Sequence, residues 1–103
     1  DLENKIKDAD LVFTGEGKID YQTAYGKTPY GVAKIAKKYD IPVIAIAGSI
    51  GEGEKTLYKH GFDGIFSILE RPSNLEYAMD NAAILVEKTA ERIMRVLTLS
   101  DKV

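Results

Sequence analysis

A glycine-rich stretch that mixes acidic, basic and amide side chains occupies residues 15–27. Its sequence is GEGKIDYQTAYGK. Phosphoryl transfer needs such groups, because cations neutralise the phosphate and a carboxylate binds Mg²⁺ or accepts the proton of the acceptor hydroxyl. The polar side chains that could act in this way are Glu16, Lys18, Asp20, Gln22, Thr23 and Lys27.

The glycines of this stretch, Gly15, Gly17 and Gly26, permit tight turns and a close approach of backbone to a ligand. A connection between a strand and a helix normally has about 2–6 residues, and longer ordered connections are often functional. Residues 15–27 therefore predict a ligand-handling loop. A solvated loop tip is the plainer alternative.

The tripeptide Gly26-Lys27-Thr28 opens a predicted helix and invites comparison with a phosphate-binding P-loop. That motif requires a glycine five residues before Gly26, where the sequence has Tyr21. Pro29 also removes one of the amides that would surround a phosphate. We reject a P-loop and keep a weaker expectation, an anion near Lys27 at the start of a helix.

Two further loops follow predicted strands. In residues 48–53, Ser49 lies among glycines that could form an anion-binding nest of backbone amides, and a purely structural turn is equally compatible. In residues 69–73, Arg71 could bind a carboxylate, but a lone surface arginine is the simpler interpretation. The single histidine, His60, precedes Gly61 at a predicted helix end and has no expected catalytic role.

The elements that must position these residues alternate along the chain. Short apolar runs at 11–14, 43–47 and 65–68 are typical of strands buried on both faces of a parallel sheet. Three helices are predicted. The first begins at Thr28, as N-cap, and ends at about Tyr39, and the second covers residues 54–60. The third begins at a Ser73–Glu76 capping box and ends at about Leu99, with an ion pair between Glu91 and Arg95.

The order (α)-β-α-β-α-β-α predicts a single α/β domain over residues 1–103, a three-layer Rossmann-like or flavodoxin-like fold with a parallel sheet. Ligands of such sheets bind beyond the carboxyl ends of the strands. The loops at 15–27, 48–53 and 69–73 should therefore lie side by side.

Composition excludes several function classes. The formal net charge of −2 lacks the basic excess of a nucleic-acid-binding domain, and the absence of cysteine argues against thiolate metal sites and disulfides. No apolar run is long enough to cross a membrane, so we expect a cytoplasmic protein without nucleic-acid or membrane partners.

The size of the predicted sheet suggests a larger protein. Three strands are fewer than the usual ~4–6, and the predicted last helix is longer than such a sheet is wide. The chain also begins with Asp1, and Leu2 and Ile6 have the spacing of a helix end. We expect a C-terminal fragment of a two-domain protein, whose open sheet edge and apolar helix could also self-associate.

The first block, with Ala9 to Asp20 followed by Gln22-Thr23 and Gly26-Lys27-Thr28-Pro29, resembles the signature of the bacterial ATP-dependent glycerate kinase family. Residues 41–49, 66–68 and 75–78 are also similar to that family, so the resemblance covers essentially the whole chain. It implies transfer of the ATP γ-phosphate to D-glycerate, with Mg²⁺, in a cleft between two α/β domains. A fragment with one wall of that cleft should be inactive alone.

The resemblance places the polar residues of 16–27 at that cleft, and the following individual roles are our inference from residue type. Asp20 and Lys18 are expected to be catalytic, and Asp20 or Glu16 to bind Mg²⁺. The expected substrate and phosphate contacts are Gly15, Glu16, Gly17, Gln22, Thr23, Gly26, Lys27 and Ser49. A stand-alone anion-binding or regulatory α/β module without catalysis is the alternative hypothesis.

Overall fold

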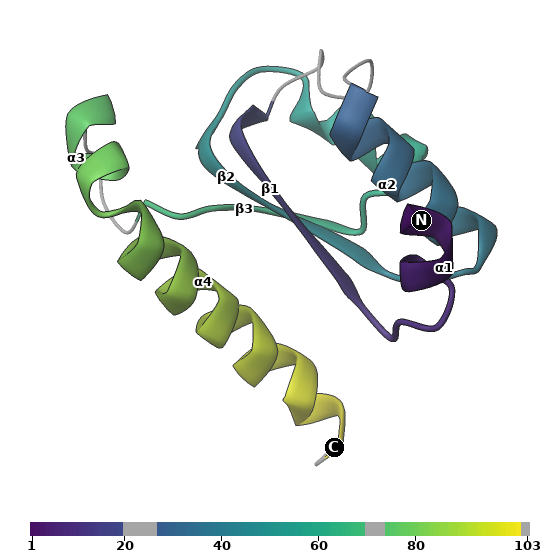
Figure 1. Cartoon of the computed structure of the whole chain (residues 1–103). Helices are drawn as coiled ribbons and strands as arrows, with labels where there is room; N and C mark the ends of the chain where they lie inside the picture. The colour runs from purple at the N-terminus through teal and green to yellow at the C-terminus, as the bar shows by residue number, and fades with distance from the viewer. Residues whose placement is uncertain (20–26, 70–73, 102–103) are drawn as a thin grey trace.

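The structure is a computed structural model that describes residues 1–19, 27–69 and 74–101. The elements are α1 (Leu2–Ile6), β1 (Val12–Ile19), α2 (Lys27–Lys38), β2 (Val43–Ile50), the 3₁₀ helix η2 (Glu54–His60), β3 (Gly64–Ser67), α3 (Leu75–Asp80), α4 (Ala82–Leu97) and η3 (Thr98–Asp101). The strands form a parallel three-stranded sheet in the order β1-β2-β3 (Figure 1). Among the described helices, none has the length and apolarity needed to cross a bilayer.

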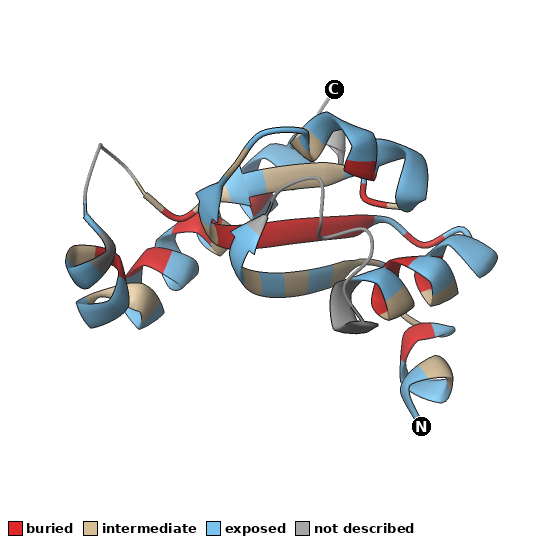
Figure 2. Cartoon of the chain, turned by 90° about the horizontal axis from the view of Figure 1, so that it is seen from above, coloured by how far each residue is buried: buried red, intermediate tan, exposed pale blue. Residues whose placement is uncertain are grey.

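Strand β2 is buried on both faces because it lies in the middle of three layers. Its residues Val43, Ala45 and Ala47 belong to a core formed with α2 and η2. Ile44 and Ile46 belong to a second core with residues of α4. Figure 2 shows the buried strand at the centre, and Figure 1 shows the sheet between α4 and the α2–η2 layer. The predicted three-layer α/β fold is confirmed.

The amino end of β2 is fixed to β3 through Asp63. The Asp63 carboxylate accepts a hydrogen bond from the Val43 amide at 2.8 Å, and the Asp63 amide donates to the Val43 carbonyl at 2.8 Å. These two bonds set the register in which Ile44 pairs with Gly64 and Ala47 pairs with Ser67.

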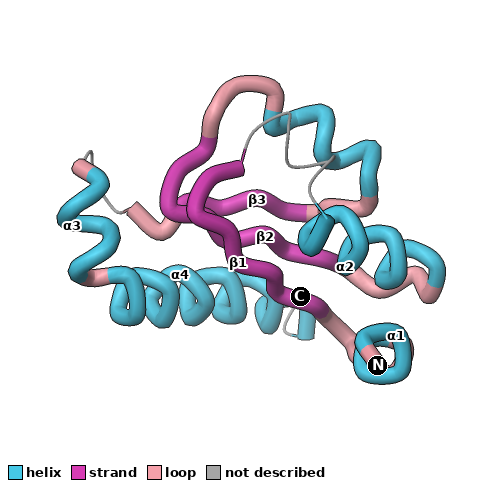
Figure 3. The backbone as a smooth tube through the Cα atoms, turned by 45° about the horizontal axis from the view of Figure 1, so that its top comes forward, coloured by secondary structure: helices cyan, strands magenta, loops and turns pink. Residues whose placement is uncertain are grey.

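Strands β1 and β2 are longer than the sequence predicts. Residues 15–19 and 48–50, expected in loops, continue the parallel ladder, and Lys18 pairs with Ser49. Figure 3 shows the two strands bending together at their carboxyl ends. Backbone hydrogen bonding does not need an apolar pattern, so glycines and charged residues extend the strands where the sheet is no longer buried on both faces.

The predicted last helix is interrupted at Asn81. Its side-chain amide donates to the Tyr77 carbonyl at 2.9 Å and its φ of −116° leaves the helical region, so α3 ends and α4 starts afresh. The N-cap of α3 is Asn74, whose side chain accepts from the Tyr77 amide at 2.8 Å, and not Ser73 as predicted.

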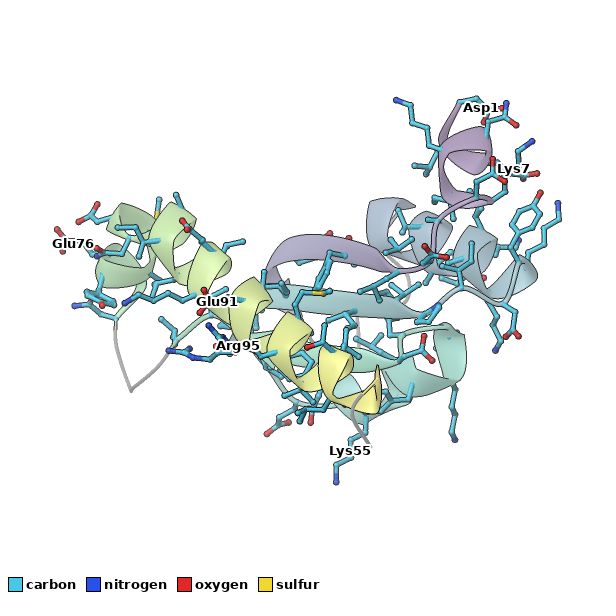
Figure 4. The ribbon with its side chains drawn as sticks, turned by 90° about the horizontal axis from the view of Figure 1, so that it is seen from below. Asp1, Lys7, Lys55, Glu76, Glu91 and Arg95 are labelled. Atoms are coloured by element: carbon cyan, nitrogen blue, oxygen red, sulfur yellow. The ribbon has the colours of Figure 1, made fainter. Side chains whose placement is uncertain are left out.

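Two other helix expectations have clear outcomes. Helix α2 begins at Lys27, which places Thr28 inside the first turn and corrects its prediction as N-cap. The predicted ion pair between Glu91 and Arg95 is confirmed at 3.6 Å (Figure 4). Both of its side chains are mostly exposed, so the pair contributes little to stability.

Gly61 ends η2 in the left-handed conformation, as predicted, with a φ of 98°. A Cβ atom at this position would lie 2.9 Å from the Ala33 carbonyl oxygen, on the backbone of α2. Glycine is required here by both the backbone angle and the neighbouring helix.

We expect Gly61→Ala to lower the free energy of unfolding by at least about 1–2 kcal/mol, because the left-handed angle alone carries that cost. Gly31→Ala is the matched control, since a Cβ there would meet nothing within 4 Å. Alanine within α2 should raise the free energy of unfolding by about 0.5–1 kcal/mol. Denaturant titration of both variants measures the difference, and equal stability of Gly61→Ala and wild type would contradict this account.

Helix α1 is joined to α2 through Glu3. The Tyr39 hydroxyl donates to Glu3 at 2.7 Å and the Lys38 ammonium lies 3.4 Å from the same carboxylate oxygen. The Tyr39 hydrogen bond and the Lys38 charge lower the pKa of Glu3 from its ordinary 4.5, and the same hydrogen bond raises the pKa of Tyr39 from 10.0.

These shifts define a pH window for the contact between α1 and α2. The lowered pKa of Glu3 gives stability that is present above pH 4.5 and is lost as pH falls through the folded pKa. The raised pKa of Tyr39 gives stability that is present below pH 10.0 and is lost as pH rises through the folded pKa.

Tyr39→Phe should raise the pKa of Glu3 back toward 4.5, because it removes the largest cause of the shift. Carbon-detected NMR titration of the Glu3 carboxyl group measures this pKa. Lys38→Met is the comparison variant and should produce a smaller rise, since its exposed ion pair is screened by solvent. An unchanged pKa in Tyr39→Phe would show that the hydrogen bond does not form.

Candidate functional site

The predicted site lies at the carboxyl ends of β1 and β2. In the parallel ladder Glu16 pairs with Ala47 and Lys18 pairs with Ser49, so charged and hydroxyl side chains of two strands meet at one edge. Parallel pairing of all three strands brings their carboxyl ends to this same edge, as expected. Of the predicted residues, Glu16, Lys18 and Ser49 are thus brought together.

The strand conformation separates the predicted residues onto two faces. Side chains alternate along a strand, and Val43, Ala45 and Ala47 define the face toward α2. Through the register, Glu16, Lys18 and Ser49 lie on that face, whereas Gly15, Gly17 and Gly48 lie on the face toward α4. The sequence predicted one continuous loop, and only the strand conformation reveals this division.

The polar face of the site is open to solvent. Lys18 and Ser49 are exposed and Glu16 is half-buried. Helix α2, which covers this face of the sheet, begins at Lys27. The Lys18 ammonium and the Ser49 hydroxyl are therefore exposed to solvent, where a charged ligand could reach them.

The glycine face of the site borders a groove of about 490 Å³ between the sheet and the bend where α3 meets α4 at Asn81, here called the α3–α4 elbow. Its lining is largely apolar, with Phe13 and Ile46 from the sheet and Met79 and Val86 from the helices. The small residues Ala78 and Ala82 line the groove together with the glycines. The sequence did not predict this groove. In the sequence, the groove is indicated only by the small residues Ala78 and Ala82 in the predicted last helix.

Several predicted residues fall outside the described part of the chain. Asp20, Gln22, Thr23 and Gly26 lie in residues 20–26, and Arg71 lies in residues 70–73. Lys27 is described only as the first residue of α2. Within residues 1–19, 27–69 and 74–101, no three acidic, histidine or cysteine side chains are grouped closely enough to hold a metal ion. Glu16 is the described carboxylate at the site.

Comparisons with known proteins identify the family to which this fold belongs. The model of the glycerate kinase family matches residues 1–98. Glycerate kinase from Bacillus subtilis strain 168 is 52% identical over 100 residues, which are 97% of this chain and 26% of the relative. Glycerate 2-kinase from Escherichia coli K12 is 42% identical over 98 residues, 95% of this chain and 26% of the relative. The chain thus spans about a quarter of the length of these relatives.

A solved structure gives the same assignment. The crystal structure of a Salmonella typhimurium LT2 protein assigned as glycerate kinase 2 matches 99% of this chain and 25% of its own, with a TM-score of 0.69 and 46% sequence identity. The family match over residues 1–98 and this shared fold lead to one conclusion: the chain belongs to the glycerate kinase family.

Proposed function

We propose that the protein containing this segment transfers the γ-phosphate of ATP to D-glycerate, and that the carboxyl ends of β1 and β2 form one wall of its active site. The observation that carries the proposal is the pairing of Lys18 with Ser49, beside Glu16, at that edge. Phosphoryl transfer relies on positioned charges of this kind. Membership in a family whose relatives are glycerate kinases supports the same chemistry.

In this proposal Lys18 is a catalytic cation that contacts a transferring phosphate or the glycerate carboxylate. Asp20 accepts the proton of the glycerate hydroxyl or binds Mg²⁺, and Lys27 provides a second cation. Gly15 and Gly17, on the opposite face of β1, leave the strand backbone accessible to part of the substrate at the same edge of the sheet. The proposed polar substrate contacts are Gln22, Thr23, Ser49 and the backbone of Gly26.

The residues at the site fit Mg²⁺ bound together with a nucleotide. Mg²⁺ in phosphoryl-transfer enzymes keeps several waters and takes one or two carboxylates plus substrate phosphates. Glu16 supplies one carboxylate at the described edge, and Asp20 is close to it in sequence. In that role Mg²⁺ would neutralise charge on the phosphates, while Lys18 orients them.

The segment should not work alone, because it offers one wall of a cleft. The α4 surface exposes large apolar side chains, among them Ile84 at 56% and Val96 at 66%. Monomeric proteins rarely leave such surface uncovered. We propose that the remainder of the parent enzyme covers it, and that a second copy could replace that cover when the segment is isolated.

The stand-alone anion-binding module considered from the sequence is less well supported. The relatives of this chain from Bacillus subtilis and Escherichia coli are named as kinases, and the segment corresponds to about a quarter of their length. A pure binding module would tolerate loss of a general base, which gives a direct test.

Lys18→Met and Asp20→Asn in the full-length enzyme should each lower kcat/KM for glycerate by about 100-fold or more, the usual cost of removing one charge-stabilising group. A coupled ATP and D-glycerate assay measures this. Lys55→Met is the matched control, since Lys55 is an exposed lysine of η2 that extends away from the fold (Figure 4). If both site variants retain wild-type rates, the wall is misassigned.

The isolated segment should show no turnover in the same assay, whereas the full-length enzyme should be active. Catalysis by positioning requires both walls and the exclusion of water. Size-exclusion chromatography of the segment, run in parallel, reports whether its apolar surface pairs two copies. Robust turnover by the segment alone would contradict the proposal that its site is incomplete.

A further inference from the structure

The glycines at the site differ in what occupies the space where a side chain would be. A Cβ built on Gly17 meets no atom within 4 Å, and one on Gly15 meets the Ile46 carbonyl oxygen at an ordinary 3.9 Å. A Cβ built on Gly48 would lie 2.9 Å from the carbonyl oxygen of Gly17 and 3.8 Å from its carbonyl carbon. At Gly48 that space is taken by the backbone of β1.

The requirement for glycine at position 48 is steric. Gly48 does not have a positive φ, which among the described glycines is found at Gly53 and Gly61. Its contact is with backbone, which cannot rotate away as the end of a long side chain can. A methyl group there must therefore move β1 away from β2 at Gly17.

Gly17 is flanked by the charged residues of the proposed site. Glu16 and Lys18, which flank Gly17 in β1, pair with Ala47 and Ser49, which flank Gly48 in β2. A displacement of the Gly17 carbonyl would shift both neighbours relative to Ser49. Misplacement of a reacting group by about 1 Å can lower a rate by about 100-fold.

We propose that Gly48 is a positioning residue: its missing side chain lets β1 close onto β2, and this close approach aligns Lys18 and Glu16 with Ser49. The inference rests on the proposed kinase function and adds a residue that acts through Lys18 without touching the substrate. It gives Gly48, which the sequence analysis placed among the glycines of a predicted anion-binding nest, a steric role within β2.

The test is a double-mutant cycle in the full-length enzyme. Gly48→Ala should lower kcat/KM for glycerate at least tenfold, and Gly48→Val should lower it further. In a Lys18→Met background, Gly48→Ala should lower it less than threefold, because coupled residues are not additive. Gly31→Ala is the control and should leave kcat/KM unchanged in both backgrounds. Equal losses from Gly48→Ala in the two backgrounds would overturn the proposal, because a general loss of folded enzyme is additive.

A crystal structure of Gly48→Ala separates this inference from the proposed function. It should show the Gly17 carbonyl moved by a few tenths of an ångström or more, whereas an unmoved carbonyl overturns the inference whatever the kinetics. An inactive wild-type enzyme would contradict the kinase proposal alone, and the structural comparison would still decide the role of Gly48. If Gly48→Ala does not fold, the same measurements are made in a Gly31→Ala background, where the alanine strengthens α2.

Discussion

The burial of β2 on both faces is the constraint on which the rest of the fold depends. Val43, Ala45 and Ala47 complete one core, and Ile44 and Ile46 complete the other, so neither helical layer can pack without this strand. A strand buried in this way cannot carry charged groups in its middle, because unpaired charges there are too costly. The charged residues of the sheet, Glu16 and Lys18, therefore lie near the carboxyl edge, where burial of β2 ends after Ala47 and Ser49 is exposed.

The sequence predicts the elements wherever packing dictates the residue types. The continuous apolar run at 43–47 identified the buried part of β2, and Gly61 identified the end of η2. The extension of β1 to Ile19 was missed, because backbone pairing at a solvent-exposed edge leaves no apolar pattern. The break at Asn81 was missed for the opposite reason, since the helical apolar repeat continues across it while a side-chain hydrogen bond ends α3.

The residues of the candidate site could be selected from the sequence, but their arrangement in space could not. Glu16, Lys18 and Ser49 were chosen by residue type, and the strand register brings them to one edge. Gly15 and Gly17 lie on the opposite face because side chains alternate along a strand. This alternation could be applied only once residues 15–19 were known to belong to β1. The groove beside the glycines unites β1 with the α3–α4 elbow, residues too distant in sequence for any motif to connect.

The strand order β1-β2-β3 repeats the order in which the chain is made. As synthesis proceeds from the amino end, each new strand finds its pairing partner already present, and the Asp63 bonds to Val43 join β3 to a strand made shortly before it. Among β1, β2 and β3, none has to wait for a later strand or insert between two existing ones, which are the long-range steps that slow folding. The three described strands can therefore pair in chain order, and α4, made after all three, packs against a sheet that has already formed.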